Sequence, residues 1–138
     1  MRILETGTYK CFNGKYYFVS ETNVKNVSTN ERLVVYFDDG SDTYAMPYVN
    51  FCAKVNQELY PDVKQEWMFE RVNFYIQHEN GKYLDFYDEF VDDINEALEF
   101  SSDYDAEMRI NPDGEYINYN PEYCRCKVVE VIKELETL

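Results

Sequence analysis

The sequence predicts an α+β protein, with a small five-stranded β-barrel in its first half and a β-hairpin, helix and strand unit in its second half. Short apolar segments separated by turn residues fill the first half. The chain contains fourteen Tyr and nine Phe, which favour strands because aromatic side chains pack well on a half-buried sheet. Apolar residues at helical spacing occur in the second half. With 138 residues, 45% of them hydrophobic, the chain can bury a core and is not a disordered polyanion.

The strands of the first half are predicted from aromatic and β-branched residues. They lie at residues 7–12, 16–19, 32–37, 43–46 and 66–72. Asn13-Gly14 predicts a hairpin turn, because this dipeptide readily adopts the positive φ angles of a type I′ turn. Pro47 ends the fourth strand, since it has no N–H for the ladder, and a loop or short helical turn is expected over 48–63. Five short strands within residues 1–72 are typical of an SH3-like barrel.

The second half is predicted to pair a hairpin with helices and a long strand. Asn80-Gly81 indicates the hairpin turn. Helical spacing predicts a helix over 91–99, and Ser102 or Asp103 can cap a second helix over 105–110. The other elements are strands at 73–78 and 83–86, a turn at 112–114, a short strand at 116–119 and a strand over 124–134 whose end is compatible with a helical turn. Because no Ser/Gly-rich linker intervenes, residues 73–138 are expected to pack against residues 1–72 after a tight junction at Val72-Asn73.

The charge of the chain is concentrated in its second half. The formal net charge is −14, and residues 1–72 hold 10 acidic and 8 basic residues whereas residues 73–138 hold 17 acidic and 5 basic residues. A polyanion cannot gain affinity for a nucleic acid or an anionic membrane by neutralising phosphates. The composition therefore argues against direct nucleic-acid or membrane binding and predicts a basic protein surface as the partner.

We call residues 85–107 the acidic segment, because they carry ten carboxylates and no Lys or Arg. Interleaved apolar residues, among them Phe86, Tyr87 and Phe90, indicate an ordered scaffold. Two interpretations stay open: a solvated face that maintains solubility, or a surface that resembles a phosphate backbone and occupies a basic groove. The candidate partner-binding residues are Asp85, Asp88, Glu89, Asp92, Asp93, Glu96, Glu99, Asp103, Tyr104, Asp105 and Glu107.

The sequence offers few groups for catalysis or metal binding. His78 is the only imidazole and lies beside a predicted hairpin turn, where a histidine is usually on the surface. Cys124 and Cys126 are too close in sequence for a usual structural zinc site, and we expect them to be small groups facing a core. No signal peptide or long apolar segment is present, which predicts a cytoplasmic protein with free thiols. We therefore predict no enzyme, no cofactor and no metal site.

Several strand and turn residues of the first half follow a familiar order: Gly7-x-Tyr9, Gly14-x-x-Tyr17-x-Val19, Val34-Val35-Tyr36 and Tyr44-Ala45-Met46-Pro47, with Phe51 and Val55 downstream. This order resembles domain of unknown function 1653, a small bacterial SH3-like family. The family usually carries His-Tyr-Lys before the first turn glycine and Arg before the proline, where this chain has Cys11-Phe12-Asn13 and Met46. If those polar residues serve a ligand in the family, that role does not carry over to this chain, and the resemblance implies only the barrel.

The second half is similar to a pattern found in small phage and mobile-element proteins. It pairs the hairpin Tyr75-Ile76…Gly81-Lys82-Tyr83-Leu84 with Phe90-Val91-Asp92-Asp93-Ile94-x-Glu96-Ala97-x-x-Phe100. In general character, a compact acidic protein of this kind also resembles the inhibitors that phages direct against host nucleases, including anti-CRISPR proteins.

Together these features predict a non-catalytic inhibitor encoded by a phage or mobile element. It would bind a basic, nucleic-acid-binding host protein, such as a CRISPR nuclease, through the acidic segment acting as a nucleic-acid mimic. The alternative is an intracellular SH3-like protein-binding module whose acidity only maintains solubility. In that case aromatic residues of the barrel such as Tyr44 and Tyr48 would contact the partner.

Overall fold

The computed structural model describes residues 1–40, 42–111 and 120–138, which form a mostly antiparallel β-sheet with few helices. This arrangement is of the α+β type that the sequence predicts. The chain divides into two compact units, one of Met1–Val72 with Ile132–Leu138 and the other of Asn73–Val131. Residues 132–138, which were predicted to belong to the second half, thus belong to the first unit.

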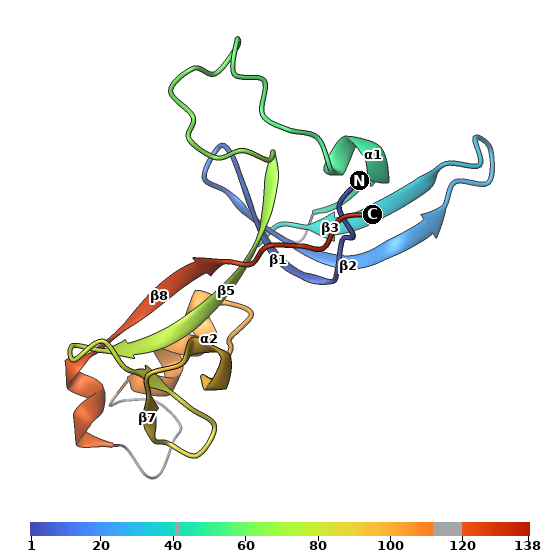
Figure 1. The fold of residues 1–138 in the computed structure, drawn as a ribbon. Coiled ribbons are helices and arrows are strands. Elements are labelled where there is room, and N and C mark those ends of the chain that lie inside the picture. The colour runs from blue at the N-terminus through green and yellow to red at the C-terminus, as the bar shows by residue number, and fades with distance from the viewer. Residues whose placement is uncertain (41, 112–119) are drawn as a thin grey trace. The chain divides into compact units, whose positions relative to one another are not determined.

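The first unit contains a curved antiparallel sheet (Figure 1). Its strands are β1 (Gly7–Cys11), β2 (Tyr16–Lys25), β3 (Arg32–Phe37), β4 (Thr43–Pro47) and the beginning of β5 (Phe69–His78), in the order β4-β3-β2-β1-β5. The short helix α1 (Tyr48–Phe51) follows β4 directly. Within the described residues the sheet is not closed, so the predicted five-stranded barrel is not confirmed.

Aromatic rings form much of the core of the first unit. The Phe51 ring stacks on that of Phe69 with 4.1 Å between centroids, and Tyr9 meets Phe51 edge to face at 5.3 Å. Val19 and Val34 are fully buried beside them. These residues come from β1, β2, β3, α1 and β5, so the aromatic residues that indicated strands also join the strands to the helix.

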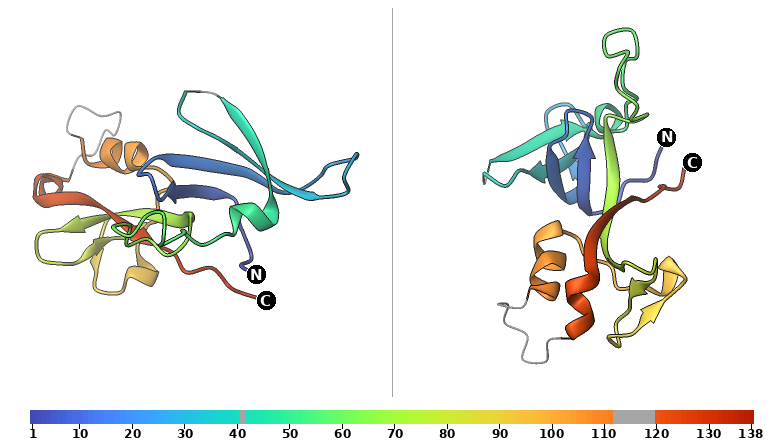
Figure 2. Two further views of the ribbon diagram at one scale, coloured as in Figure 1. Left: turned by 90° about the horizontal axis from the view of Figure 1, so that it is seen from above. Right: turned by 90° about the vertical axis from the view of Figure 1, so that its left-hand side faces the viewer.

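The two ends of the chain lie side by side in the first unit, as both views of Figure 2 show. Arg2 forms a β-bridge with Thr137, and the Leu138 N–H donates to the Met1 carbonyl at 3.0 Å. This closure ties residues 132–138 to the N-terminal segment.

The strand β5 corrects the prediction of two strands that meet at Val72-Asn73. It runs without a break from Phe69 to His78, and nine of its ten residues are buried. Neither Gly nor Pro interrupts it, and Asn73 is buried within the strand. A strand that is covered on both faces shows no alternation of polar and apolar residues to mark its limits.

The second unit is built around the end of β5. Its other elements are β6 (Tyr83–Leu84), β7 (Phe90–Val91), the 3₁₀ turns η1 (Ile94–Glu96) and η2 (Pro121–Arg125), α2 (Asp103–Ile110) and β8 (Cys126–Ile132), which pairs with β5. The buried Ile76, Leu84, Ala106 and Tyr123 lie in these elements.

The helix predicted over 91–99 is wrong, since only the three residues of η1 are helical there. The Leu98 N–H donates to the Leu84 carbonyl at 2.9 Å, and Phe100 and Phe74 exchange backbone hydrogen bonds of 2.8 and 2.9 Å. Pairing with these distant residues outweighs the local helical spacing.

The second predicted helix is confirmed as α2, and Ser102 caps it by accepting a hydrogen bond from the Asp105 N–H at 3.1 Å. The last predicted strand begins at Cys126 and ends at Ile132, because η2 occupies residues 121–125. The turn predicted at 112–114 and the strand at 116–119 lie outside the described residues. Among the helices described, none has the length and apolar character needed to cross a membrane.

Candidate functional site

Eight of the ten carboxylates in the acidic segment are exposed. They are Glu89, Asp92, Asp93, Glu96, Glu99, Asp103, Asp105 and Glu107, and they lie from the turn after β6 to α2. Tyr104 on α2 is also largely exposed. Within the part of the chain that the structure describes, Asp88 alone among the ten carboxylates belongs to an ion pair. Most of the negative charge predicted to meet a partner therefore faces solvent without a cation.

Asp85 is buried and organises the turn between β6 and β7. Its Oδ1 accepts hydrogen bonds from the backbone N–H groups of Tyr87 at 2.8 Å and Glu89 at 2.9 Å. The Asp85 N–H donates to the Glu89 carbonyl at 2.8 Å. Because its carboxylate is used inside the turn, Asp85 supports the surface and is not positioned to contact a partner directly.

Asp88 holds the same turn from its other side. Its backbone adopts a positive φ of 62°, and its carboxylate accepts hydrogen bonds from the Tyr123 hydroxyl and from Asn120 Nδ2, the latter at 3.3 Å. Arg109 Nη2 lies 3.9 Å from the Asp88 carboxylate. Burial and the bond to Asp88 raise the pKa of Tyr123 above its ordinary value, so Tyr123 remains a hydrogen-bond donor. Asp88 is thus another internal support.

Between these two supports, Phe86 and Tyr87 extend into solvent. Their relative exposures are 77% and 80%, and their rings meet edge to face with 5.7 Å between centroids. The sequence predicts both residues as part of the scaffold, because they interrupt the run of acids. The signal that could have located them is Asp85 itself, since an Asp that bonds the backbone two and four residues later creates a turn with exposed residues between. We call Phe86 and Tyr87 the aromatic tip.

Two other acids have local structural partners although they are exposed. Asp93 caps η1 by accepting a hydrogen bond from the Asn95 N–H at 2.9 Å. Glu99 accepts a hydrogen bond from the Tyr75 hydroxyl at 3.2 Å. Both keep a solvent-facing carboxylate, so both can still contribute to a negative surface.

The expectation that His78 lies on the surface is wrong, because its side chain is only 7% exposed. His78 Nδ1 accepts a hydrogen bond from the Asn80 N–H at 3.1 Å, and Nε2 lies 2.8 Å from Glu122 Oε2. The neutral tautomer with its hydrogen on Nε2 satisfies both contacts. The hydrogen bond from His78 lowers the pKa of Glu122. In this arrangement the imidazole joins the hairpin after β5 to η2.

The two neighbouring cysteines do not face a core as predicted. Cys124 is exposed within η2, and its thiol lies 3.1 Å from the Pro121 carbonyl, whereas Cys126 begins β8 and is half-buried. Burial, together with the negative charge of Glu122, raises the pKa of Cys126 to about 11. A nucleophilic cysteine needs the opposite shift. Because η2 includes Cys124, only Cys126 lies in the strand that was predicted over 124–134.

Within residues 1–40, 42–111 and 120–138, no three His, Cys, Asp or Glu side chains are grouped so that they could hold a metal ion. Comparison with protein families, with curated proteins and with solved structures finds no match to this chain. The resemblances to domain of unknown function 1653 and to anti-CRISPR proteins stay predictions.

Proposed function

We propose that this protein is a non-catalytic inhibitor, encoded by a phage or mobile element, that binds a basic, nucleic-acid-binding host protein in the host cytoplasm. The observation that carries the proposal is the set of eight exposed carboxylates without cationic partners in the acidic segment. A CRISPR nuclease is a partner of the required kind, because its nucleic-acid channel is strongly basic. The acidic segment would act there as a nucleic-acid mimic.

The supports beneath the turn favour a binding surface over a merely solvated one. Asp85 and Asp88 hold the backbone of residues 85–89 through hydrogen bonds, so little conformational entropy remains to be lost when a partner binds. The aromatic tip adds apolar area at the edge of the charged surface. Exposed aromatic residues beside charge are typical of interface positions that contribute much of the binding energy.

Charge also restricts the partner. The second unit, residues 73–131, contains 15 acidic and 4 basic residues, a net charge of −11, so a second copy of this chain would be repelled. A basic surface would be attracted over a distance set by the ionic strength, and association would slow as salt is added.

The test is binding to a guide-RNA-loaded CRISPR nuclease at rising salt concentrations, together with its DNA cleavage activity. The variant combines Glu89→Gln, Asp92→Asn, Glu96→Gln and Glu107→Gln, which leaves both internal supports in place. We expect this variant to bind at least tenfold more weakly and to depend less on salt, because electrostatic attraction scales with the charges removed.

A matched control removes four exposed charges from the first unit, with Glu21→Gln, Glu31→Gln, Asp39→Asn and Glu58→Gln. Both variants have the same net charge, so a difference between them isolates the position of the charges. Equal affinity of wild type and the acidic-segment variant would disprove the proposal for the nuclease tested.

A second candidate function is an SH3-like protein-binding module, and one observation favours it. Phe18 on β2 and Phe37 on β3 are cross-strand neighbours with 5.3 Å between ring centroids, and both are exposed. Of the two aromatic residues that the sequence predicts at such a surface, Tyr44 is exposed. Tyr48 is buried, and its hydroxyl donates to the Arg2 carbonyl and accepts from the Leu4 N–H. In this case Phe18→Ser would weaken partner binding and the acidic-segment variant would not.

A further inference from the structure

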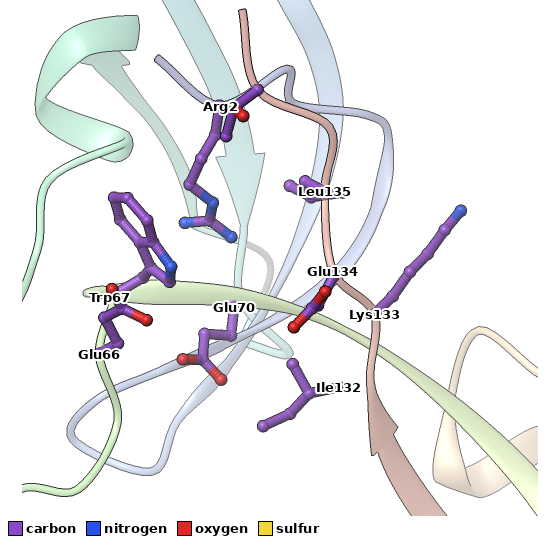
Figure 3. A pocket seen from close by; sticks show the side chains of 9 residues that line it. Arg2, Glu66, Trp67, Glu70, Ile132, Lys133, Glu134 and Leu135 are labelled. Atoms are coloured by element: carbon purple, nitrogen blue, oxygen red, sulfur yellow. The ribbon is translucent and has the colours of Figure 1, made fainter.

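A cavity of about 380 Å³ lies within the first unit, between the residues around the start of β5 and the C-terminal segment. Figure 3 shows Trp67 and Glu70 on one side of this space, Glu134 and Leu135 on the other, and Arg2 above. The residues that line this cavity belong to none of the candidate sites predicted from the sequence, and the proposed function does not involve them.

Glu70 lines this cavity, and only 7% of the residue is exposed. Within the described part of the chain no residue donates a hydrogen bond to its carboxylate or lies within ion-pair distance of it, and Arg2 interacts with it only at longer range. A carboxylate at the wall of a partly enclosed cavity is less fully hydrated than one on an open surface, so a ligand that donates hydrogen bonds to it is favoured there. Figure 3 shows the Glu70 and Glu134 side chains extending into the same space.

Arg2 supplies the opposite charge in the cavity. It is only 5% exposed, its Nη1 donates to the Phe69 carbonyl at 2.8 Å, and its guanidinium carbon lies 4.6 Å from the centre of the Trp67 ring. No carboxylate of the described chain lies within ion-pair distance of it. A guanidinium has five N–H donors, so Arg2 retains donors for an oxygen of a ligand.

The two other charged groups at the rim are already paired. Glu66 lies 3.2 Å from Lys54, and Lys133 lies 2.8 Å from Glu5, directed away from the cavity in Figure 3. Glu70 and Glu134 therefore face one buried cation, Arg2, which leaves an excess of one negative charge. Trp67 and Leu135 form an apolar part of the cavity wall.

We infer that this cavity binds an α-ammonium group with a neighbouring carbonyl or carboxylate oxygen. The ammonium group donates to Glu70 and Glu134, the oxygen accepts from Arg2, and an apolar side chain lies against Trp67 and Leu135. A free α-amino acid and the N-terminus of a peptide both carry this chemistry. The inference does not depend on the acidic segment, which belongs to the other unit.

Calorimetric titration of the full chain with three ligands tests this inference. The ligands are leucine, leucinamide and N-acetylleucinamide. Leucinamide has an amide in place of the carboxylate of leucine, and N-acetylleucinamide also lacks the ammonium group. We expect N-acetylleucinamide to bind at least tenfold more weakly than the better of the other two. Tighter binding of leucine would identify a free amino acid as the natural ligand, and equal or tighter binding of leucinamide would identify a peptide N-terminus.

Glu70→Gln preserves the shape of the side chain and should weaken binding of the better ligand at least tenfold. The exposed Glu134→Gln should weaken it as well, and it provides a second test if Glu70→Gln does not fold. Glu136→Gln, one of the exposed acids outside the cavity, should leave the affinity unchanged. The inference is overturned if no ligand binds at millimolar concentration, if acetylation has no effect, or if neither cavity variant weakens binding.

Discussion

At the scale of single residues, the bond between His78 and Glu122 links pH to stability. The hydrogen bond from His78 favours the ionised carboxylate and lowers the pKa of Glu122 below its ordinary value of 4.5. A group with a lowered pKa stabilises the fold above its unfolded-state pKa, and this stabilisation is lost as the pH falls through the folded-state pKa.

We therefore expect Glu122→Gln to lower the free energy of unfolding at neutral pH and to have progressively less effect below pH 4.5. Urea unfolding of both proteins between about pH 3 and pH 7 measures the difference. Glu58→Gln is the control, because Glu58 is exposed and no described residue bonds its carboxylate. A difference that stays constant across this range would contradict the role given to the His78 bond.

At Gly7 the addition of a single Cβ atom is expected to destabilise the protein. The φ of Gly7 is +132°, and a Cβ added there would lie 2.4 Å from the Arg71 guanidinium. Arg71 Nε lies 3.3 Å from Glu5, and Arg71 Nη1 donates to the Thr8 carbonyl at 3.4 Å. Gly7→Ala should thus destabilise the protein by about 3 kcal/mol, from backbone strain and displacement of Arg71.

The same substitution at Gly14 distinguishes backbone strain from the displacement of Arg71. The φ of Gly14 is also positive, at +90°, but no atom lies within 4 Å of an added Cβ. Gly14→Ala should therefore lose only the strain, about 1 kcal/mol. Thermal unfolding of both variants measures the comparison, and equal losses would show that Arg71 adapts without cost.

At the scale of elements, the turn after β6 depends on Asp85. Asp85→Ala leaves the N–H groups of Tyr87 and Glu89 without their acceptor, so we expect a loss of about 2 kcal/mol in stability. Faster hydrogen exchange at these two amides would locate the effect. Asp92→Ala, another acid of the same segment that is exposed, should change neither quantity. Unchanged exchange in Asp85→Ala would show that β6 and β7 hold the turn without Asp85.

The same scale explains which elements the sequence could predict. The strands β1, β3 and β4 lie where turn residues and segments rich in aromatic and β-branched residues predicted them, and Ser102, one of the two predicted caps, begins α2. The predicted helix over 91–99 fails because Leu98 and Phe100 pair with residues that are distant in the sequence. Local spacing cannot reveal such a pairing.

At the scale of the whole molecule, the net charge of −14 destabilises the folded state by self-repulsion. Asp103 and Glu107 lie one turn apart on α2, and such like-charged neighbours are unfavourable in water. Raising the salt concentration from about 20 to 500 mM should screen these contacts and increase the free energy of unfolding by on the order of 1 kcal/mol.

Denaturant unfolding at several salt concentrations measures this increase. The variant with Glu89→Gln, Asp92→Asn, Glu96→Gln and Glu107→Gln should respond less, because four of the repelling charges are absent. A stability that is independent of salt in wild type would show that the exposed carboxylates interact weakly with one another.

The sequence by itself determined the α+β class, the positions of most strands and the concentration of acid in the second half, because turn chemistry, periodicity and charge are local properties. Only the tertiary structure decided that Asp85 and Asp88 are internal supports, that Phe86 and Tyr87 are exposed and that His78 is buried. It also brought Arg2, Glu70 and Glu134 to one cavity. These outcomes depend on contacts between residues far apart in the chain, such as His78 with Glu122 and Asp88 with Tyr123, whose partners no local pattern specifies.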